Sequence, residues 1–134
     1  MALIPTLSIK DTTTFSDEIN FSITDSLTTK APSQSFTKIV ADTTGANNII
    51  VPANDNKQTW VFIRHTGKAA DGTTDTTNHC DIEITGDAPA GTLKPLEFCF
   101  FPFCGNGASK GVQLQAVSAS VTMEYAYWSD STAQ

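Results

Sequence analysis

The sequence predicts an all-β protein: an antiparallel β-sandwich or jelly-roll-like barrel of seven to nine strands, with an extended N-terminal arm. Three observations predict this. Thr, Val, Ile, Phe and Tyr recur along the chain, and branched or flat side chains favour strands. Apolar and polar residues alternate with a period of two, and no segment keeps the helical period beyond one turn. Clusters of Gly, Asn, Asp and Pro separate these segments at intervals of roughly 8–14 residues.

The first predicted strands are short and lie close to the N-terminus. Leu7 and Ile9 alternate with Ser8 and Lys10, and the same alternation returns in residues 19–24. A period of two places one set of side chains on each face of a strand. The pattern therefore predicts two amphipathic strands.

These two strands lie within residues 1–35, a part of the chain rich in Ser and Thr and poor in large apolar side chains. We interpret it as an extended arm that pairs on its own domain or on a neighbouring subunit. Two ordinary sandwich strands joined by a polar loop are the alternative. Residues 36–134 then form the β-sandwich domain.

Four further segments are predicted as strands of the sandwich. Residues 59–63 and 96–101 are apolar on both faces, which is typical of central strands covered by protein on each side. Residues 80–85 alternate most regularly. Residues 121–127 form a last strand whose aromatic side chains either close the core or anchor an interface. We expect residues 129–134 to be frayed.

Composition and charge exclude several classes of protein. The net charge is −6 with only eight Lys and Arg residues, so the chain lacks the positive surface that neutralises phosphates, and we expect no nucleic-acid partner. The longest apolar run, residues 98–104, is far shorter than the roughly 20 residues of a membrane span, and we expect no membrane partner. No signal peptide is visible, and three cysteines is an odd number, so we expect reduced thiols and synthesis in a cytoplasm.

Metal binding is not expected. His79 and Cys80 are adjacent, so on a strand their side chains point to opposite faces, whereas zinc ligands normally pair two to four residues apart on a turn. Cys99 and Cys104 lie inside an apolar run, where cysteine behaves as a small hydrophobe. The loop at residues 70–78 offers carboxylates to a cation, but it lacks the alternating ligands of a calcium loop.

Catalysis is not expected either. Residues 105–111 are rich in glycine, but their spacing is wrong for a phosphate-binding loop, and we interpret them as a hairpin turn. The chain has two histidines, His65 and His79, and no nucleophile is placed near either by a known spacing. We therefore predict no catalytic residue, no cofactor and no metal, and a protein that is not an enzyme.

The order of three segments resembles a known family. A strand ending in Thr66-Gly67 is followed by residues 93–102 and then by a strand containing Glu124-Tyr125. This order resembles small virion structural proteins of tailed bacteriophages, in which a Lys-Pro-Gly-Glu-Phe segment precedes a terminal Glu-Tyr strand. Leu96 stands here where that pattern has glycine. The resemblance covers roughly residues 36–128.

The resemblance implies a non-enzymatic structural component of a bacteriophage virion, of the capsid decoration (cement), neck or tail accessory type. Such a subunit is made in the host cytoplasm and located in the virion. It stabilises the particle as a homo-oligomer, a trimer or a ring, in contact with other virion proteins such as the major capsid or tail proteins. A carbohydrate- or receptor-binding module of a phage tail is the alternative, and it predicts an exposed Trp or Tyr in a shallow groove.

The expected interface residues are apolar and come from the arm and from the aromatic strands. They are Leu3, Ile4, Leu7, Ile9, Phe15, Trp60, Tyr127 and Trp128.

Overall fold

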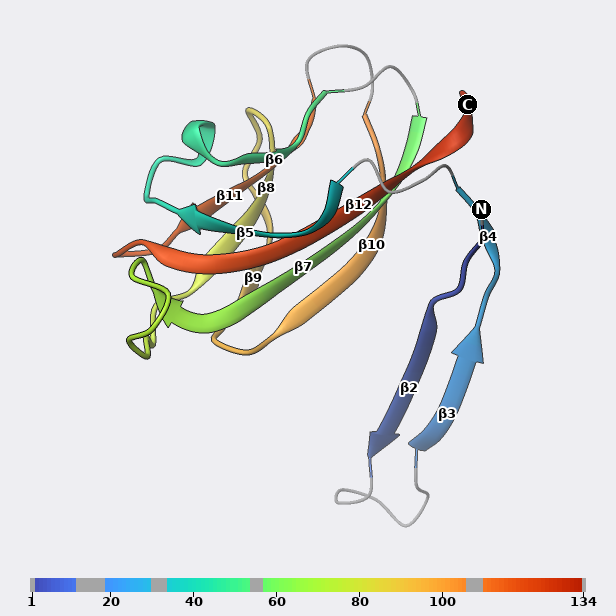
Figure 1. Ribbon diagram of the computed structural model, residues 1–134, viewed down its shortest axis with the longest axis horizontal. Helices are drawn as coiled ribbons and strands as arrows, with labels where there is room; N and C mark the ends of the chain where they lie inside the picture. Colours follow the sequence, from blue (N-terminus) through green and yellow to red (C-terminus); the bar gives the residue numbers. More distant parts are fainter. Residues whose placement is uncertain (1, 12–18, 30–33, 54–56, 106–109, 134) are drawn as a thin grey trace.

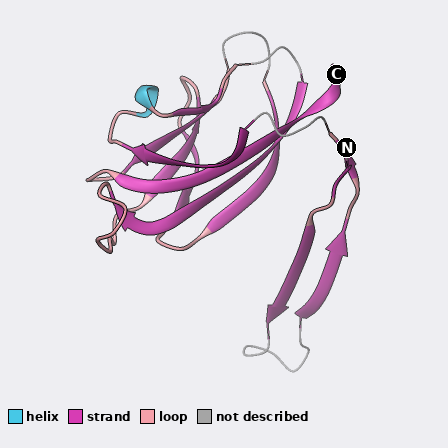
Figure 2. Cartoon of the chain, viewed as in Figure 1, coloured by secondary structure: helices cyan, strands magenta, loops and turns pink. Residues whose placement is uncertain are grey.

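A computed structural model of the chain describes residues 2–11, 19–29, 34–53, 57–105 and 110–133. These residues form antiparallel strands and one short 3-10 helix, η1 (Gly45–Asn47), and they include no α-helix (Figure 2). Two four-stranded sheets lie face to face (Figure 1). The prediction of an all-β antiparallel sandwich is confirmed. No helix in the described part of the chain could cross a membrane.

Apart from β8 and β9, which follow one another along the chain, neighbouring strands of the two large sheets are far apart in the sequence. The first sheet has the order β10-β7-β12-β5. Its strands are β5 (Gln34–Ala41), β7 (Lys57–Ala69), β10 (Phe98–Cys104) and β12 (Val121–Ala133). The second sheet has the order β6-β11-β8-β9. Its strands are β6 (Ile49–Val51), β8 (Cys80–Ile84), β9 (Pro89–Leu93) and β11 (Val112–Ala116).

The wiring of these eight strands is that of a jelly roll. The first strand pairs with the last, β5 with β12, and the pairing continues inward as β6 with β11, β7 with β10 and β8 with β9. Two further ladders, β7 with β12 and β8 with β11, complete the two sheets. A long double strand folded over two sheets in this way is the eight-stranded jelly roll. The sequence alone allows a plain sandwich or a jelly roll, and the strand order decides between them.

Four short strands precede the jelly roll. They are β1 (Ala2–Leu3), β2 (Thr6–Asp11), β3 (Ile19–Thr24) and β4 (Leu27–Thr28). β1 pairs with β4 and β2 pairs with β3, and none of the four joins either large sheet among the described residues. The β2–β3 hairpin projects away from the jelly roll (Figure 1). With these four, the described residues form twelve strands, above the predicted seven to nine, while the jelly roll alone has eight.

The core lies between the two sheets. Val61, Ile63 and Met123 point inward from the first sheet, and Cys80 and Leu114 point inward from the second; all five side chains are fully buried. Because each strand alternates its side chains between two faces, the next residue along each strand points away from this core. Burying one such aliphatic side chain contributes about 1.5–3 kcal/mol.

Two expectations about individual strands are wrong. The sequence predicts a central strand, covered on both sides, where β10 lies, but β10 is at the edge of the first sheet, and Phe98 on its outer face is 64% exposed. The sequence also predicts fraying over residues 129–134, but β12 continues as a strand to Ala133. Strand order and strand length both depend on pairing with distant segments, which local composition does not report.

The connection from β5 to β6 covers polar side chains on the outer face of β8 and β11 in the second sheet. Glu83 and Gln113 on this face are 7% and 8% exposed, and the Gln113 amide Nε2 donates to the Glu83 carboxylate Oε2 at 2.7 Å. Gly45 of η1 lies directly on them, and Asn48 donates its side-chain N–H to the Leu114 carbonyl at 2.9 Å. The connection thus covers these polar groups and gives them hydrogen-bond partners.

The turn that leads into β10 contains a strained residue. The Glu97 N–H donates to the Lys94 carbonyl at 3.1 Å, with Pro95 second and Leu96 third in the turn. Leu96 has φ = +72°, a left-handed conformation that costs an L-residue about 1–2 kcal/mol. Turns with Pro in the second position and a positive φ in the third favour glycine in that third position.

We therefore expect Leu96→Gly to stabilise the protein by about 0.5–1 kcal/mol. Relief of the positive φ outweighs the extra freedom that glycine has in the unfolded chain, and the Leu96 side chain is 66% exposed, so little burial is lost. Urea unfolding followed by tryptophan fluorescence measures the effect. Leu96→Ala removes the same side chain but keeps the strain, so an equal gain in both variants would contradict this explanation.

Candidate interaction surface

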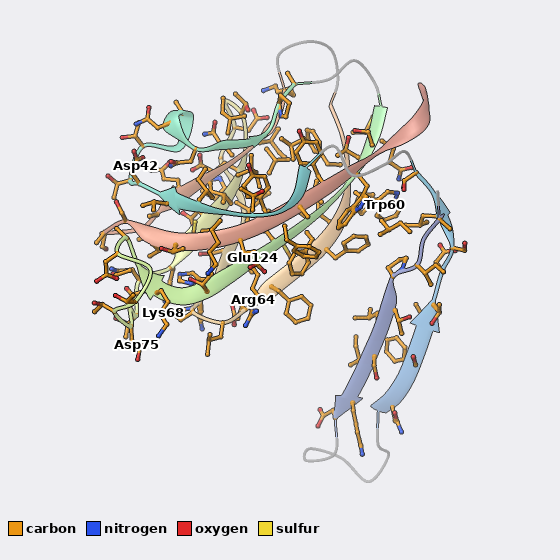
Figure 3. All side chains as sticks on the ribbon, in the orientation of Figure 1. Asp42, Trp60, Arg64, Lys68, Asp75 and Glu124 are labelled. Atoms are coloured by element: carbon orange, nitrogen blue, oxygen red, sulfur yellow. The ribbon has the colours of Figure 1, made fainter. Side chains whose placement is uncertain are left out.

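The outer face of the first sheet carries a continuous group of aromatic side chains, which we call the aromatic face. All four strands contribute because register and alternation bring outward positions together: Trp60 lies opposite Trp128 and Phe62 lies opposite Phe100. The sticks in Figure 3 show this gathering of rings around the labelled Trp60. The members of the aromatic face are Phe36, Trp60, Phe62, Phe98, Phe100 and Trp128.

The rings of the aromatic face contact one another in specific geometries. Trp60 and Phe100 are stacked, with centroids 5.4 Å apart and planes at 12°. Phe36 meets Phe62 edge to face at 5.4 Å and Trp128 at 6.2 Å. Such pairs contribute roughly 0.5–1.5 kcal/mol each beyond burial. The rings are therefore held in place before any partner arrives.

The aromatic face remains open to solvent. Phe36 and Phe98 are 62% and 64% exposed, and the other four members are only partly buried. A row of charges lies beside it: Lys38, Glu124 and Arg64 are opposite one another on adjacent strands, with alternating sign. Figure 3 labels Glu124 and Arg64. A monomeric protein rarely exposes an apolar patch of this kind without a partner for it.

The β2–β3 hairpin of the arm is also amphipathic. Leu7 pairs with Ile23 and Ile9 pairs with Phe21, so four apolar side chains share one face, which we call the hairpin face. The opposite face is polar and includes a hydrogen bond between the Thr6 and Thr24 hydroxyls at 3.0 Å. The side chains of the hairpin face are 41–62% exposed.

An open apolar groove runs between the base of the arm and the aromatic face. It has a volume of about 620 Å³, and Leu3, Pro5 and Leu7 line one side while Phe36, Phe98 and Trp128 line the other. A smaller groove of about 190 Å³ continues from Leu7 and Ile23 to the Trp60–Phe100 stack. The hairpin face and the aromatic face therefore border the same opening.

Comparison with protein-family models, curated proteins and solved structures found no match for this chain.

The structure brings together four of the eight residues expected at an interface. Leu3 and Leu7 line the groove from the arm side, and Trp60 and Trp128 belong to the aromatic face. Ile4 and Ile9 are 62% and 41% exposed on the arm. Phe15 lies outside the described residues.

Tyr127 does not lie on the same surface as Trp60 and Trp128. It is one residue from Trp128 and therefore points to the opposite face of β12, where it packs against the core. Burial there raises the pKa of its phenol. The period of two separates these neighbours, so an aromatic run cannot place all its members on one surface.

Sequence reasoning misses four members of the aromatic face: Phe36, Phe62, Phe98 and Phe100. A signal for three of them is present, because residues 59–63 and 96–101 are apolar on both faces of a strand. That pattern is typical of strands covered by the protein itself. It equally fits a strand whose second face is covered by another molecule.

The described titratable side chains were compared with the requirements of a metal site. Among the described residues there is no group of three His, Cys, Asp or Glu side chains that could hold a metal ion. All three cysteines carry free thiols, and burial raises the pKa of Cys80 to about 12 and of Cys99 to about 11. High pKa values keep these two thiols protonated and unreactive at neutral pH.

The loop at residues 70–78 uses its carboxylates internally. Asp71 accepts hydrogen bonds from the Thr74 hydroxyl and from the Thr73 and Thr74 amides, and these bonds lower its pKa to about 2. Asp75 pairs with Lys68 at 2.5 Å (Figure 3). Both carboxylates are therefore engaged with protein groups that hold the loop in shape.

Proposed function

We propose that this protein is a non-enzymatic structural subunit of a virus particle, of the bacteriophage type, that stabilises the particle through protein–protein contacts. The observation that carries the proposal is a jelly roll with an N-terminal arm and an uncovered apolar face. Jelly rolls are a recurrent architecture of viral capsid and lectin domains. Arms and apolar sheet faces are means by which such subunits hold one another.

The chemistry of the surface supports a protein partner. The groove is lined almost wholly by apolar side chains, Thr6 being the one hydroxyl that the described residues place there. Protein interfaces have apolar, aromatic-rich centres with charged residues at the rim, and the row of Lys38, Glu124 and Arg64 fits such a rim. Within this proposal, capsid decoration is the role we favour, with the major capsid protein as the surface on which the subunit sits.

The test is whether the chain is part of purified particles. We expect peptide mass spectrometry of gradient-purified particles from cells that produce the chain to detect it in many copies per particle, and antibodies against it to label the particle surface. A chain abundant in the infected cells but absent from the particles would overturn the proposal. A major capsid peptide from the same sample serves as the internal control.

A carbohydrate-binding module of a phage tail is the second candidate, favoured by one observation. Trp60 stacked on Phe100 is a partly exposed aromatic pair beside a shallow groove, as a sugar-binding platform requires. Sugar sites also need polar groups that orient the hydroxyls, and Asp25 is the one charged group that lines this groove in the described part of the chain. A glycan array with the wild-type chain and with Trp60→Ala distinguishes the two candidates.

A further inference from the structure

Two apolar surfaces border the same opening, and the described residues cover neither of them completely. The hairpin face presents Leu7, Ile9, Phe21 and Ile23, and the aromatic face presents six rings. On the second sheet, in contrast, the connection through η1 covers the outward side chains of Glu83 and Gln113, and these polar groups are hydrogen-bonded. On the first sheet, the described residues place only the base of the arm beside the rings.

The hairpin by itself is not expected to be stable. A two-stranded hairpin is marginal in water, and three strands or a packed face are needed for independent stability. At its root the Asp25 N–H donates to the Pro5 carbonyl at 3.1 Å and β1 pairs with β4, which directs the hairpin away from the jelly roll (Figure 1). Ile9 and Phe21, in its outer half, line neither of the two grooves. A partner surface is needed to cover them.

We propose that a neighbouring copy of this chain covers both surfaces. The hairpin face of one copy packs on the aromatic face of a second copy, and the hairpin of the second copy packs on the first copy or on a third. Each copy carries one of each surface, so an exchange leaves neither surface bare. Self-complementary contacts of this kind generate closed dimers or rings. The inference goes beyond the proposed function, because self-association is a property of the purified chain and needs no virus particle.

The area available is sufficient for a stable interface. Seven side chains of the arm and the aromatic face are 41–64% exposed. They are Ile4, Leu7, Ile9, Phe21, Ile23, Phe36 and Phe98. With about 150–200 Å² for a large apolar side chain, they present roughly 600 Å² on each copy. Covering both copies of a pair removes roughly 1,200 Å², above the approximately 1,000 Å² that a specific interface needs.

The first experiment measures the oligomeric state of the full chain by sedimentation velocity at concentrations from about 1 to about 100 µM, a range that brackets the affinity of a micromolar interface. The wild-type chain is expected to form a dimer or a larger closed ring. The double substitution Ile9→Thr with Phe21→Thr keeps strand-forming residues but removes the apolar surface, and it should raise the dissociation constant at least tenfold. Phe98→Thr should do the same from the other side of the contact.

The matched control is a substitution by threonine at an exposed apolar residue outside the two proposed contact surfaces. Ile49→Thr changes a 49% exposed isoleucine on β6, in the second sheet, and should leave the dissociation constant unchanged. Far-ultraviolet circular dichroism confirms that each variant keeps its strands. A wild-type chain that stays monomeric at the highest concentration, or an Ile49→Thr variant that dissociates as readily as the hairpin variant, would overturn the proposal.

A second experiment distinguishes two arrangements: the hairpin packs on the first sheet of another copy, or it packs on the first sheet of its own chain. Ile9→Cys and Phe98→Cys are made in separate chains that carry Cys104→Ser, since Cys104 is the exposed native thiol. After the two chains are mixed and allowed to exchange, a short bismaleimide should join Ile9→Cys of one copy to Phe98→Cys of the other. If both substitutions in one chain give only a link within that chain, the hairpin closes on its own sheet and the proposal is wrong.

Discussion

Gly111→Ala is expected to destabilise the protein by about 3 kcal/mol, through a clash that no side chain can relieve. A Cβ atom at this position would lie 2.3 Å from the Val51 carbonyl oxygen and 3.1 Å from the Ala53 nitrogen. Both are backbone atoms, so β6 itself must move away from the start of β11. That movement breaks the short β6–β11 ladder, which begins with Val112 opposite Val51.

The measurement is a urea unfolding curve at one fixed protein concentration, with Trp60 and Trp128 as fluorescent reporters. A loss of this size is a large part of the roughly 5–15 kcal/mol by which domains are typically stable, so the midpoint should fall strongly. Gly91→Ala is the matched control. Gly91 lies in β9, where an added Cβ atom would meet no other atom within 4 Å, and its φ is not positive.

The control should be neutral or slightly stabilising, by about 0.4–1 kcal/mol, because alanine restricts the unfolded chain more than glycine does. Equal midpoints for the two variants would show that the approach of Gly111 to Val51 is not a constraint on the fold. A loss of stability confined to Gly111→Ala would show that the close approach of Gly111 to the backbone of Val51 and Ala53 leaves no room for a side chain.

Strands that alternate apolar and polar residues can be predicted from sequence because alternation is a local signal, whereas β5, β6, β9 and β11 are not among the predicted segments. Residues 80–85 show it clearly: Cys80 and Ile82 point into the core, and Asp81 and Glu83 point away from it. The sheet to which a strand belongs, and whether it lies at an edge, depend on partners far along the chain. The prediction of a central position for β10 is wrong for this reason. Its sequence is apolar on both faces, and that pattern does not tell whether the outer face is covered by the protein itself or by a partner molecule.

The interaction surface can be predicted in part. Leu7 and Ile9 stand out as apolar residues in a polar arm, and Trp60 and Trp128 as large aromatics in strands. Their convergence on one opening arises from the jelly-roll order, in which β7 lies between β10 and β12. Because that order comes from pairs separated by more than thirty residues, no short window of sequence contains it.

The buried histidine is the second position where a large effect is expected. His65 is fully buried on the inner face of β7, and its ring holds two backbone groups: Nδ1 accepts the Gly67 N–H at 3.0 Å, and Nε2 lies 2.9 Å from the Asn78 carbonyl oxygen. Since Nδ1 accepts, Nε2 carries the proton and donates it to Asn78. The neutral ring thus connects β7 to the end of the loop at residues 70–78.

His65→Leu should cost about 2–4 kcal/mol, because it leaves a buried N–H and a buried carbonyl without their partner. The same urea curves measure it. His79→Gln, at the other histidine of the chain, is an exposed position and should change the midpoint little. A midpoint for His65→Leu close to that of the wild type would mean that water replaces the ring at both backbone groups.

Acid should lower the stability of the folded protein through the same residue, His65. Burial lowers the pKa of His65 below its ordinary 6.5, with smaller opposing effects from Asn78 and Glu97, and a further lowering from the nearby His79. The unfolded chain then takes up a proton near pH 6.5 while the folded chain does not. Stability is therefore complete above about pH 6.5 and falls as the pH drops toward the lowered folded pKa, by at most about 1.4 kcal/mol per pH unit.

Unfolding curves at about pH 7.5, 6.5 and 5.5 test this window, which lies above the range in which carboxylates with ordinary pKa values titrate. Wild type and His79→Gln should both lose stability between the two lower pH values, and His65→Leu should lose much less. If His79→Gln abolished the loss and His65→Leu kept it, the acid sensitivity would belong to the exposed histidine. A protonated His65 can no longer accept the Gly67 N–H, so acid would break this hydrogen bond within β7, while Nε2 can still donate to the Asn78 carbonyl oxygen.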